Sequence, residues 1–406
     1  MIYKKLFEKA IVQTDKICTP AYFYFEKTLN DSVKTISSAF GKKIELCYSI
    51  KANPFLTAFV GDGIKIFEVC SYGEYQICKN QLSVDTEIIF GGVCKLDYEI
   101  SEAIKDERVI VTVESLNQLE IIDRLSAERK ERTKILLRLS AGNQFGLSER
   151  NLKKVINSRS SYTNVNMIGI QYYAGTQTFK IDDILKKINY LFDIVLQIER
   201  ESVFKFEIVD FGAGIGVPYY KVDYDKNNFE QMLKETSELI LKRRNHHRVI
   251  CEMGRAIAAE CGVYVSRVID QKENAGRKFS ILDGGTNHIK YYGQAFGGRN
   301  VVIDILNDAA ETDVYTICGP LCTVNDILLN NETLKKHTIG DIFLFPNAGA
   351  YCQTEANALF LSRELPIVNL VRTDGSIVTL REEKCTYKIN SKINNVKQFG
   401  NMSRGK

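Results

Sequence analysis

Short apolar stretches recur eight times between residues 45 and 255, and they constrain the fold more than any other feature. They are Glu45–Ala52, Lys65–Ser71, Glu87–Gly92, Arg108–Ser115, Lys134–Ser140, Met167–Gly175, Phe206–Gly214 and Arg248–Arg255. Their continuous apolar character is typical of parallel strands covered on both faces. Helix-like periodic stretches separate most of them: Asp97–Lys105, Leu116–Arg129, Leu152–Ser158, Ile181–Glu199 and Phe229–Arg244. Eight strand-then-helix units predict an α/β fold of the (β/α)8 TIM-barrel type.

The pattern changes after Cys261, where strand-like runs follow one another with few helices between them. These runs are Val263–Val268, Phe279–Leu282, Val301–Leu306, Val314–Cys318, Asp341–Phe345 and Ile367–Arg372. Thr373–Ser376 reads as a hairpin turn leading into Ile377–Arg381. We therefore expect a barrel over residues 26–261 and a β-rich domain, a sandwich or barrel, over residues 1–25 and 262–406.

Composition excludes several classes of protein. The chain has 54 basic and 50 acidic residues, a net charge of +4, which is too small to indicate nucleic acid or an anionic membrane as partner. It has no apolar run long enough for a transmembrane helix and no signal-peptide segment at its start. Its 11 cysteines form no CxxC pair, which favours a reduced, cytoplasmic protein. None of the 4 histidines has zinc-type spacing, so no metal is expected.

Polar residues gather where the predicted barrel strands end, and in a barrel these ends converge on one mouth. Lys51 closes the first strand, where a buried lysine needs a reason. A Schiff-base lysine is one reading, and a lysine that extends its amine to solvent is the other. The remaining strand-end residues are Glu68, Arg138, Tyr173, Gly212–Gly216, Glu252 and Gly254–Arg255.

The glycine segment Gly212–Gly216 directly follows the seventh strand, where barrels often hold a phosphate. A tight turn without a ligand explains it equally well, and it is not a dinucleotide fingerprint. Glu252 lies in an apolar run and needs a partner, either a protonated cofactor ring nitrogen or an arginine such as Arg138 or Arg255. Lys51, Glu252 and a phosphate loop together indicate pyridoxal 5'-phosphate.

With these residues in place the chain resembles the alanine-racemase-fold (fold type III) pyridoxal-phosphate decarboxylases, the relatives of diaminopimelate, ornithine and arginine decarboxylase. The resemblance rests on Tyr48–Asn53, Gly212–Gly216, Glu252 with Gly254–Arg255, Gly319–Cys322 with Asp326, and Gly349–Tyr351. It implies that Lys51 and Cys322 are catalytic, with Cys322 as proton donor. The expected cofactor-binding residues are Lys51, Glu68, Arg138, Tyr173, Gly212, Gly214, Gly216, Glu252, Gly254, Arg255 and Tyr351. In the family Cys322 and Asp326 come from the neighbouring subunit, which implies a homodimer.

Three departures from the family concern the substrate. Tyr173 stands where the family stacks a histidine on the cofactor, and it can stack without carrying a proton near neutral pH. Thr323 stands where diamine-forming members have an acid for the distal ammonium. The Arg-Pro-rich segment of diaminopimelate enzymes is replaced by Asp283–Tyr292, which carries His288 and Lys290. We expect Thr323, Asp326, His288 and Lys290 to bind substrate.

These departures look most like a secondary-metabolism branch acting on carrier-tethered glutamyl groups or acylated siderophore intermediates. The resemblance thus implies a pyridoxal-phosphate-dependent α-decarboxylase, a carboxy-lyase, of a modified, acylated or carrier-tethered amino acid. The alternatives are a diaminopimelate- or ornithine-type decarboxylase of a free amino acid, an amino-acid racemase, and a non-catalytic cofactor carrier. An acyl carrier protein is a further expected partner, for which the basic stretch Lys242–Arg248 is either a docking surface or a solvated helix end.

Overall fold

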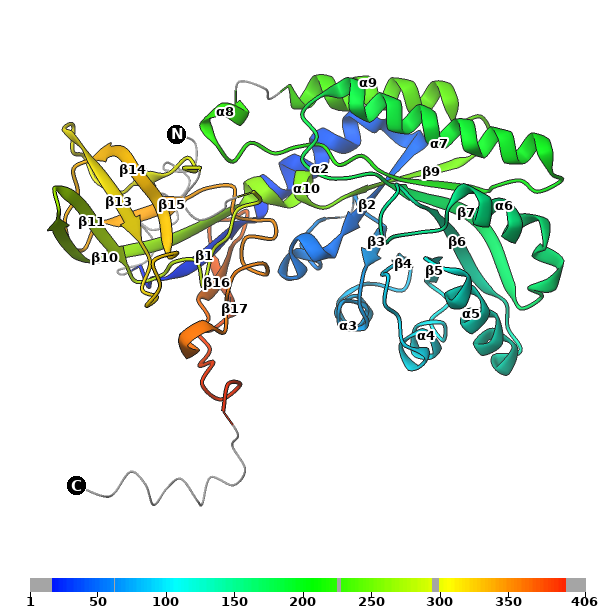
Figure 1. Cartoon of the computed structure of the whole chain (residues 1–406), viewed down its shortest axis with the longest axis horizontal. Coiled ribbons are helices and arrows are strands. Elements are labelled where there is room, and N and C mark those ends of the chain that lie inside the picture. The colour runs from blue at the N-terminus through cyan, green and yellow to red at the C-terminus, as the bar shows by residue number, and fades with distance from the viewer. Residues whose placement is uncertain (1–16, 62, 225–227, 294–298, 392–406) are drawn as a thin grey trace, which may run out of the picture. The chain divides into compact units, whose positions relative to one another are not determined.

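The computed structural model describes residues 17–61, 63–224, 228–293 and 299–391. The chain divides into two compact units (Figure 1). One unit comprises Lys27–Pro218 and Val222–Glu260. The other comprises Met1–Glu26, Tyr219–Lys221 and Cys261–Lys406. The three residues Tyr219–Lys221 thus belong to the second unit although the chain on either side of them belongs to the first.

The first unit is a closed barrel of eight parallel strands, which confirms the predicted TIM barrel (Figure 1). Strand β9 pairs with β2 and closes the ring, with Ile44 opposite Val249. The strands are β2 (Ile44–Ser49), β3 (Ile66–Val69), β4 (Glu87–Phe90), β5 (Val109–Val113), β6 (Thr133–Leu139), β7 (Val165–Tyr173), β8 (Ile208–Gly212) and β9 (Arg248–Met253).

One buried apolar residue from each barrel strand joins a single cluster. Its members are Cys47, Ile66, Ile89, Ile110, Leu136, Ile168, Ile208 and Ile250. Most are β-branched, and such side chains pack well on a pleated surface. The strands are apolar on both faces because this cluster covers one face while helices cover the other.

Helices follow the strands, and side-chain caps mark several of their starts. Ser71, Ser115 and Ser148 each accept a hydrogen bond from a backbone N–H of the first helical turn. Helices α7 and α9 pack against each other. The helices are α2 (Glu26–Phe40), α3 (Tyr72–Gln81), α4 (Asp97–Ala103), α5 (Leu116–Arg129), α6 (Glu149–Asn157), α7 (Ile181–Glu201), α8 (Lys221–Tyr224), α9 (Phe229–Arg243) and α10 (Arg255–Ala258).

The second unit is a nine-stranded mixed sheet, in agreement with the β-rich domain expected from the sequence. Strand β1 lies between β10 and β16, so the start of the chain pairs with segments far along it. The strands are β1 (Ala21–Phe25), β10 (Gly262–Asn274), β11 (Arg277–Leu282), β12 (Asp304–Ile305), β13 (Thr312–Cys318), β14 (Ile327–Lys335), β15 (Ile342–Phe345), β16 (Ile367–Val371) and β17 (Ile377–Arg381).

Two sequence predictions in this unit were wrong in detail. The run predicted as a strand over Val301–Leu306 contains only the two-residue strand β12. Strand β14 was not predicted, because Asn330, Asn331 and Glu332 interrupt its apolar pattern. Asn330 and Asn331 fall at a break in the register between β13 and β14, and Asn331 has a φ of +47°, so the regular alternation of a strand is lost there.

Candidate active site

Lys51 lies directly after β2, in a short 3-10 turn formed by Ile50–Ala52. The next turn begins at Asn53, whose side chain accepts a hydrogen bond from Phe55 N and so stops the strand from continuing. Lys51 Nζ contacts both carboxylate oxygens of Glu68 in β3, at 3.0 and 2.9 Å. The side chain of Lys51 is 37% exposed, whereas that of Glu68 is only 5% exposed. The amine therefore sits at the barrel mouth, anchored to a buried carboxylate.

The charge of Glu68 depends on its contacts with Lys51 and Cys70. Burial acts to raise the pKa of Glu68, but the Lys51 ammonium and hydrogen bonds from Cys70, Lys51 and Ser49 outweigh it, so the pKa lies below its usual value. The Cys70 thiol is 2.9 Å from Glu68 Oε1 and 3.4 Å from Lys51 Nζ. Glu68 is therefore an anion that holds Lys51, a role that its strand-end position alone did not reveal.

Glu252 lies on β9 opposite Gly212, and its carboxylate is buried. Gln171 Nε2 donates a hydrogen bond of 2.5 Å to Glu252 Oε1. Burial and the charge of Glu68 raise the pKa of Glu252 to about 7, although Lys51 acts in the opposite direction. Lys51 and Glu68 both act on the pKa of Glu252. Lys51 and Glu252, the two main residues of the sequence prediction, therefore interact electrostatically.

Two polar neighbours of Glu252 were missed by the sequence reasoning. Gln171 and Asp210 face each other in the register between β7 and β8. Burial, followed by the charge of Glu252, raises the pKa of Asp210 well above its usual value. For both Gln171 and Asp210, the only signal in the sequence was a polar residue among apolar strand residues.

Tyr173, the residue at the family's stacking position, lies at the end of β7 near Lys51. Lys51 Nζ is 5.9 Å from the centroid of the Tyr173 ring. A Cβ at Gly212 would overlap the edge of this ring, so the ring lies against the backbone of the adjacent strand. Burial raises the pKa of Tyr173, so the hydroxyl stays neutral near neutral pH.

The glycine segment is shaped by the chain that follows β7. Gly214 has a φ of +63°, and a Cβ there would overlap the carbonyl oxygen of Gly175. Thr178 N donates to Gly214 O at 2.9 Å, and Gly216 N donates to Thr178 O at 3.0 Å. A Cβ at Gly216 would crowd the Phe179 ring. The glycines are thus required for this close packing, and the N–H of Gly216 is already engaged with Thr178.

Arg138 lies on β6 and forms a buried ion pair with Glu114, at 2.6 Å between Nη1 and Oε1. The other oxygen of Glu114 accepts a hydrogen bond from Gly146 N at 3.0 Å. Glu114, which directly follows β5, fixes the guanidinium and was not among the predicted residues. Lys95 also lies nearby, and burial lowers its pKa to about 8. Gly254 and the buried Arg255 lie at the end of β9, where α10 begins.

The predicted site residues of the second unit include two that are held by their own domain. Asp326 accepts hydrogen bonds from Thr286 N, Thr286 Oγ1 and Leu321 N, each at 2.8 Å. His288 contacts the Tyr264 hydroxyl through Nδ1 at 3.1 Å and Glu364 O through Nε2 at 2.7 Å. Burial lowers the pKa of His288 to about 4, so the ring is neutral. Both side chains fix turns within this unit.

The other predicted residues of the second unit are accessible. Cys322 and Lys290 are exposed, and Thr323 and Tyr351 are partly exposed. Tyr351 has a φ of +64°, an uncommon conformation for a bulky residue. Thr323 Oγ1 accepts a hydrogen bond from Asn325 N at 3.3 Å. Asp326 accepts a hydrogen bond from Leu321 N and so fixes the two ends of the turn that contains Cys322–Asn325.

The residues of the barrel fit pyridoxal phosphate. Lys51 offers a partly exposed amine, and the Tyr173 ring offers an aromatic surface beside it. The buried Glu252 carboxyl, with its raised pKa, is the type of group that a protonated ring nitrogen would stabilise as an anion. The glycine-lined turn and Arg255 lie at the strand ends where barrels bind phosphate.

Comparisons with known proteins agree with this arrangement. Residues 26–259 match the family model described as pyridoxal-dependent decarboxylase, pyridoxal binding domain. Diaminopimelate decarboxylase of Bacteroides thetaiotaomicron is 26% identical over 381 residues, covering 88% of this chain and 97% of that protein. A decarboxylase of L-glutamyl groups on the BtrI acyl-carrier protein, from Niallia circulans, is 26% identical over 401 residues, covering 91% and 92%.

The solved structures give the same result for the fold. Diaminopimelate decarboxylase of M. jannaschii superposes with a TM-score of 0.82 at 25% identity, covering 96% of this chain and 95% of that one. Its complex with L-lysine gives a TM-score of 0.83 at 24% identity, covering the same shares. No helix in the described part of this chain is long and apolar enough to cross a membrane.

Proposed function

Because this chain belongs to the pyridoxal-dependent decarboxylase family, we propose that it removes the α-carboxylate of an amino acid whose distal amine is absent or already acylated. The enzyme is a pyridoxal-phosphate-dependent amino-acid decarboxylase, and the proposal concerns its substrate. The observation that carries the proposal is Thr323, a neutral residue next to Cys322. A hydroxyl offsets the desolvation of an ammonium less well than a carboxylate does.

The similarity to a decarboxylase of carrier-bound glutamyl groups supports this proposal, because such a substrate has no free distal ammonium. An acyl carrier protein is then the partner that presents the amino acid. Free diaminopimelate is the second candidate substrate, since several relatives of comparable identity are diaminopimelate decarboxylases. Against it stands the segment Asp283–Tyr292, which has no arginine and in which His288 is committed to its own domain.

In the proposed mechanism each barrel residue has one task. When bound, pyridoxal phosphate supplies the electron sink that accepts the electrons left at Cα by departing carbon dioxide. Lys51 would hold the cofactor aldehyde, and Glu68 fixes the position of its amine. Glu252, held by Gln171, would keep the ring nitrogen protonated. Tyr173 would cover one face of the ring, and Arg138, fixed by Glu114, would orient its polar substituents.

The second unit would complete the site of a neighbouring subunit. Cys322 and Val324 lie on an exposed turn, with Val324 88% exposed, and Asp326 pins the base of that turn. An apolar side chain that is this exposed on a rigid support suits burial against another subunit. We therefore assign to Cys322 of the partner subunit the delivery of a proton to Cα, and we expect a homodimer.

The test is to measure released carbon dioxide with a panel of substrates. The panel contains free diaminopimelate, ornithine, lysine and glutamate, an Nω-acylated diamino acid, and glutamate loaded on a carrier protein. We expect turnover of the acylated or carrier-bound amino acids and little turnover of free diamino acids. Preference for free diaminopimelate would contradict the substrate proposal. Loss of optical activity without gas release would indicate a racemase, and cofactor binding without any turnover would indicate a carrier.

A further inference from the structure

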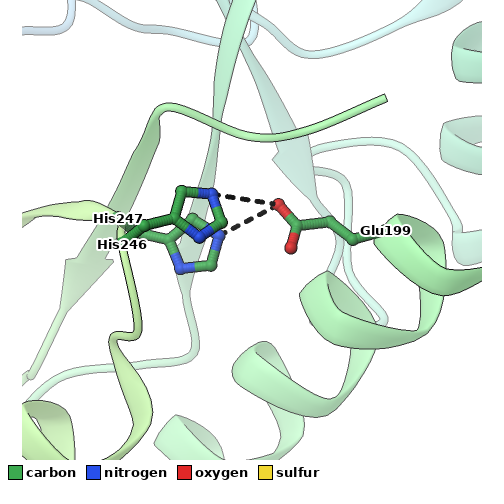
Figure 2. A group of neighbouring side chains, drawn as sticks. All are labelled: Glu199, His246 and His247. Carbon is green, nitrogen blue, oxygen red and sulfur yellow. Dashed lines mark hydrogen bonds and ion pairs between the residues drawn. The ribbon is translucent and has the colours of Figure 1, made fainter. Parts of the chain in front are cut away.

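The structure brings together three side chains on the barrel, away from the strand ends that carry Lys51. Glu199 lies in the last turn of α7, and His246 and His247 directly precede β9 (Figure 2). They therefore lie at the amino-terminal end of the barrel strands, whereas Lys51 and Glu252 lie at the carboxyl-terminal end. One ligand atom from each of the three residues lies within 4.8 Å of the others.

Figure 2 shows both imidazole rings directed toward the Glu199 carboxylate. His247 Nε2 is 3.0 Å and His246 Nε2 is 3.9 Å from the same atom, Glu199 Oε1. Zinc binds nitrogen and oxygen at about 2.0–2.2 Å, so two of its ligand atoms are roughly 3 to 4 Å apart. Both measured distances fall within this range. Glu199 and His247 are buried while His246 is half exposed, which leaves a path for an ion from solvent.

The hydrogen bonds around His247 fix which nitrogen faces Glu199. Nδ1 is 2.7 Å from the carbonyl oxygen of Arg244, which can only accept, so Nδ1 carries a proton. Metal-binding histidines commonly donate their second nitrogen to a backbone carbonyl in this way. Nε2 then faces a carboxylate at 3.0 Å, and this contact is favourable only if a proton or a metal ion lies between them. Glu199 is itself oriented by Phe206 N, which donates to Oε1 at 2.9 Å.

We propose that Glu199, His246 and His247 form a structural binding site for a divalent transition-metal ion of the zinc type, with water completing the coordination. Two imidazoles and one carboxylate are a donor set that zinc uses in proteins. The ion links the end of α7 to the start of β9. Because the amino-terminal face of a barrel serves stability, we expect the ion to stabilise the fold and leave decarboxylation unchanged.

The surroundings set the conditions under which the ion binds. Asn245 Nδ2 lies 3.2 Å from His246 Nδ1 and donates to it, so metal binding through Nε2 requires the Asn245 amide to rotate and present its oxygen to Nδ1–H. Two cations lie close: Lys205 Nζ donates to Glu199 O at 2.8 Å, and Arg244 Nε donates to His247 O at 3.2 Å. These two positive charges oppose the binding of a cation.

The test uses the full chain loaded with pyridoxal phosphate and freed of excess cofactor. Zinc binding is titrated by calorimetry for wild type, H246Q, E199Q and the control E201Q. The control removes an exposed acid of the same helix that pairs with Lys153 and is not a member of the cluster. We expect one equivalent bound by wild type and E201Q, and at least tenfold weaker binding by H246Q and E199Q. Because H246Q leaves the buried pair between Glu199 and His247 intact, it should still fold.

Two further readouts separate this site from others. Cobalt bound here should give the weak visible bands of nitrogen and oxygen ligands, whereas binding by exposed cysteines would give intense near-ultraviolet sulfur bands. Zinc should raise the melting temperature of wild type more than that of H246Q, with carbon dioxide release unchanged. The proposal is overturned if wild type binds no zinc, if H246Q binds as tightly as wild type, or if cobalt shows sulfur bands only. In those cases a proton alone links His247 to Glu199.

Discussion

Both carboxylate oxygens of Glu68 lie within 3.0 Å of the amine of Lys51, so two neighbouring barrel strands hold this amine in place. This pairing fixes the amine at the mouth before any ligand arrives. It also keeps a buried acid ionised, because the pKa of Glu68 is lowered despite its burial. The relationship makes Lys51 the first residue to test.

Replacing Lys51 with alanine should abolish carbon dioxide release and the imine absorbance of the bound cofactor. The physical reason is that alanine has no amine that could bond to the cofactor aldehyde. Activity and absorbance spectra check the prediction. K65A is the matched control, because Lys65 is exposed and its ion pair with Asp85 lies at the surface, where such a pair contributes at most about 1 kcal/mol. Turnover that survives in K51A would refute the assignment.

Replacing Glu252 with glutamine should change how stability depends on pH in the cofactor-free protein. Folding raises the pKa of Glu252 from 4.5 to about 7, so between these values the folded protein keeps a proton that the unfolded chain has released. Stability therefore falls as the pH rises through this window. Wild type should lose on the order of 3 kcal/mol relative to E252Q across the window from 4.5 to about 7, since each pKa unit corresponds to about 1.4 kcal/mol. Urea denaturation across this range measures the difference, and parallel curves would contradict it.

Replacing Glu114 with glutamine should weaken cofactor retention through Arg138. The buried guanidinium would lose its charged partner at 2.6 Å, and its position would be less well fixed. A hydrogen bond between charged groups contributes about 1.5–3 kcal/mol, so affinity should fall about 10- to 100-fold. Fluorescence titration of the cofactor measures this, with E120Q, an exposed acid of α5, as control. If E114Q and E120Q bind the cofactor with equal affinity, Glu114 does not contribute to cofactor binding.

Replacing Gly214 with alanine should destabilise the barrel and impair cofactor binding. The new Cβ would overlap the Gly175 carbonyl and would also sit at a φ of +63°. G142A isolates the second effect, because Gly142 has a φ of +84° and nothing within 4 Å of its Cβ position. Backbone strain alone costs about 1 to 2 kcal/mol, so G214A should exceed that. Equal melting temperatures of the two variants would show that the backbone of Gly212–Gly216 moves to accommodate the new Cβ.

Replacing Thr323 with glutamate should shift specificity toward free diamino acids. A carboxylate at this position would compensate a distal ammonium, which we expect to improve kcat/KM for ornithine about 10- to 100-fold. T323Q matches the size of glutamate without its charge and should give no such gain. If both variants behave alike, Thr323 does not contact the distal end of the substrate.

The barrel could be predicted from sequence because its strands are buried on both faces and so remain continuously apolar. The same rule missed β14, where Asn330 and Asn331 fall at a break in the register with β13 and interrupt the apolar run. In the site, Lys51 and Glu252 stood out as charges at strand ends. Gln171 and Glu114 did not, because their importance lies in the contacts they make across neighbouring strands, and one sequence does not show such contacts.

The pairing of Glu199 with His247 shows a second limit of prediction from sequence, which concerns residues that are far apart in the chain. These residues are 48 positions apart, and short-range ligand spacing cannot reveal a cluster that a helix and a strand bring together. The roles of Asp326 and His288 were similarly hidden. Their hydrogen bonds to Thr286 and Tyr264 only become evident once the turns of the second unit are in place.

Strand β1 has a consequence for synthesis. Ala21 pairs with Val265 on one side and with Ile367 on the other, so β1 lacks both of these partners until residues far along the chain have been made. The barrel can close during this wait, while Ala21–Phe25 stays an unpaired apolar edge that could join another chain. Nascent chains arrested near residue 260 should therefore recruit chaperones or aggregate, and release of the full-length chain should end that exposure.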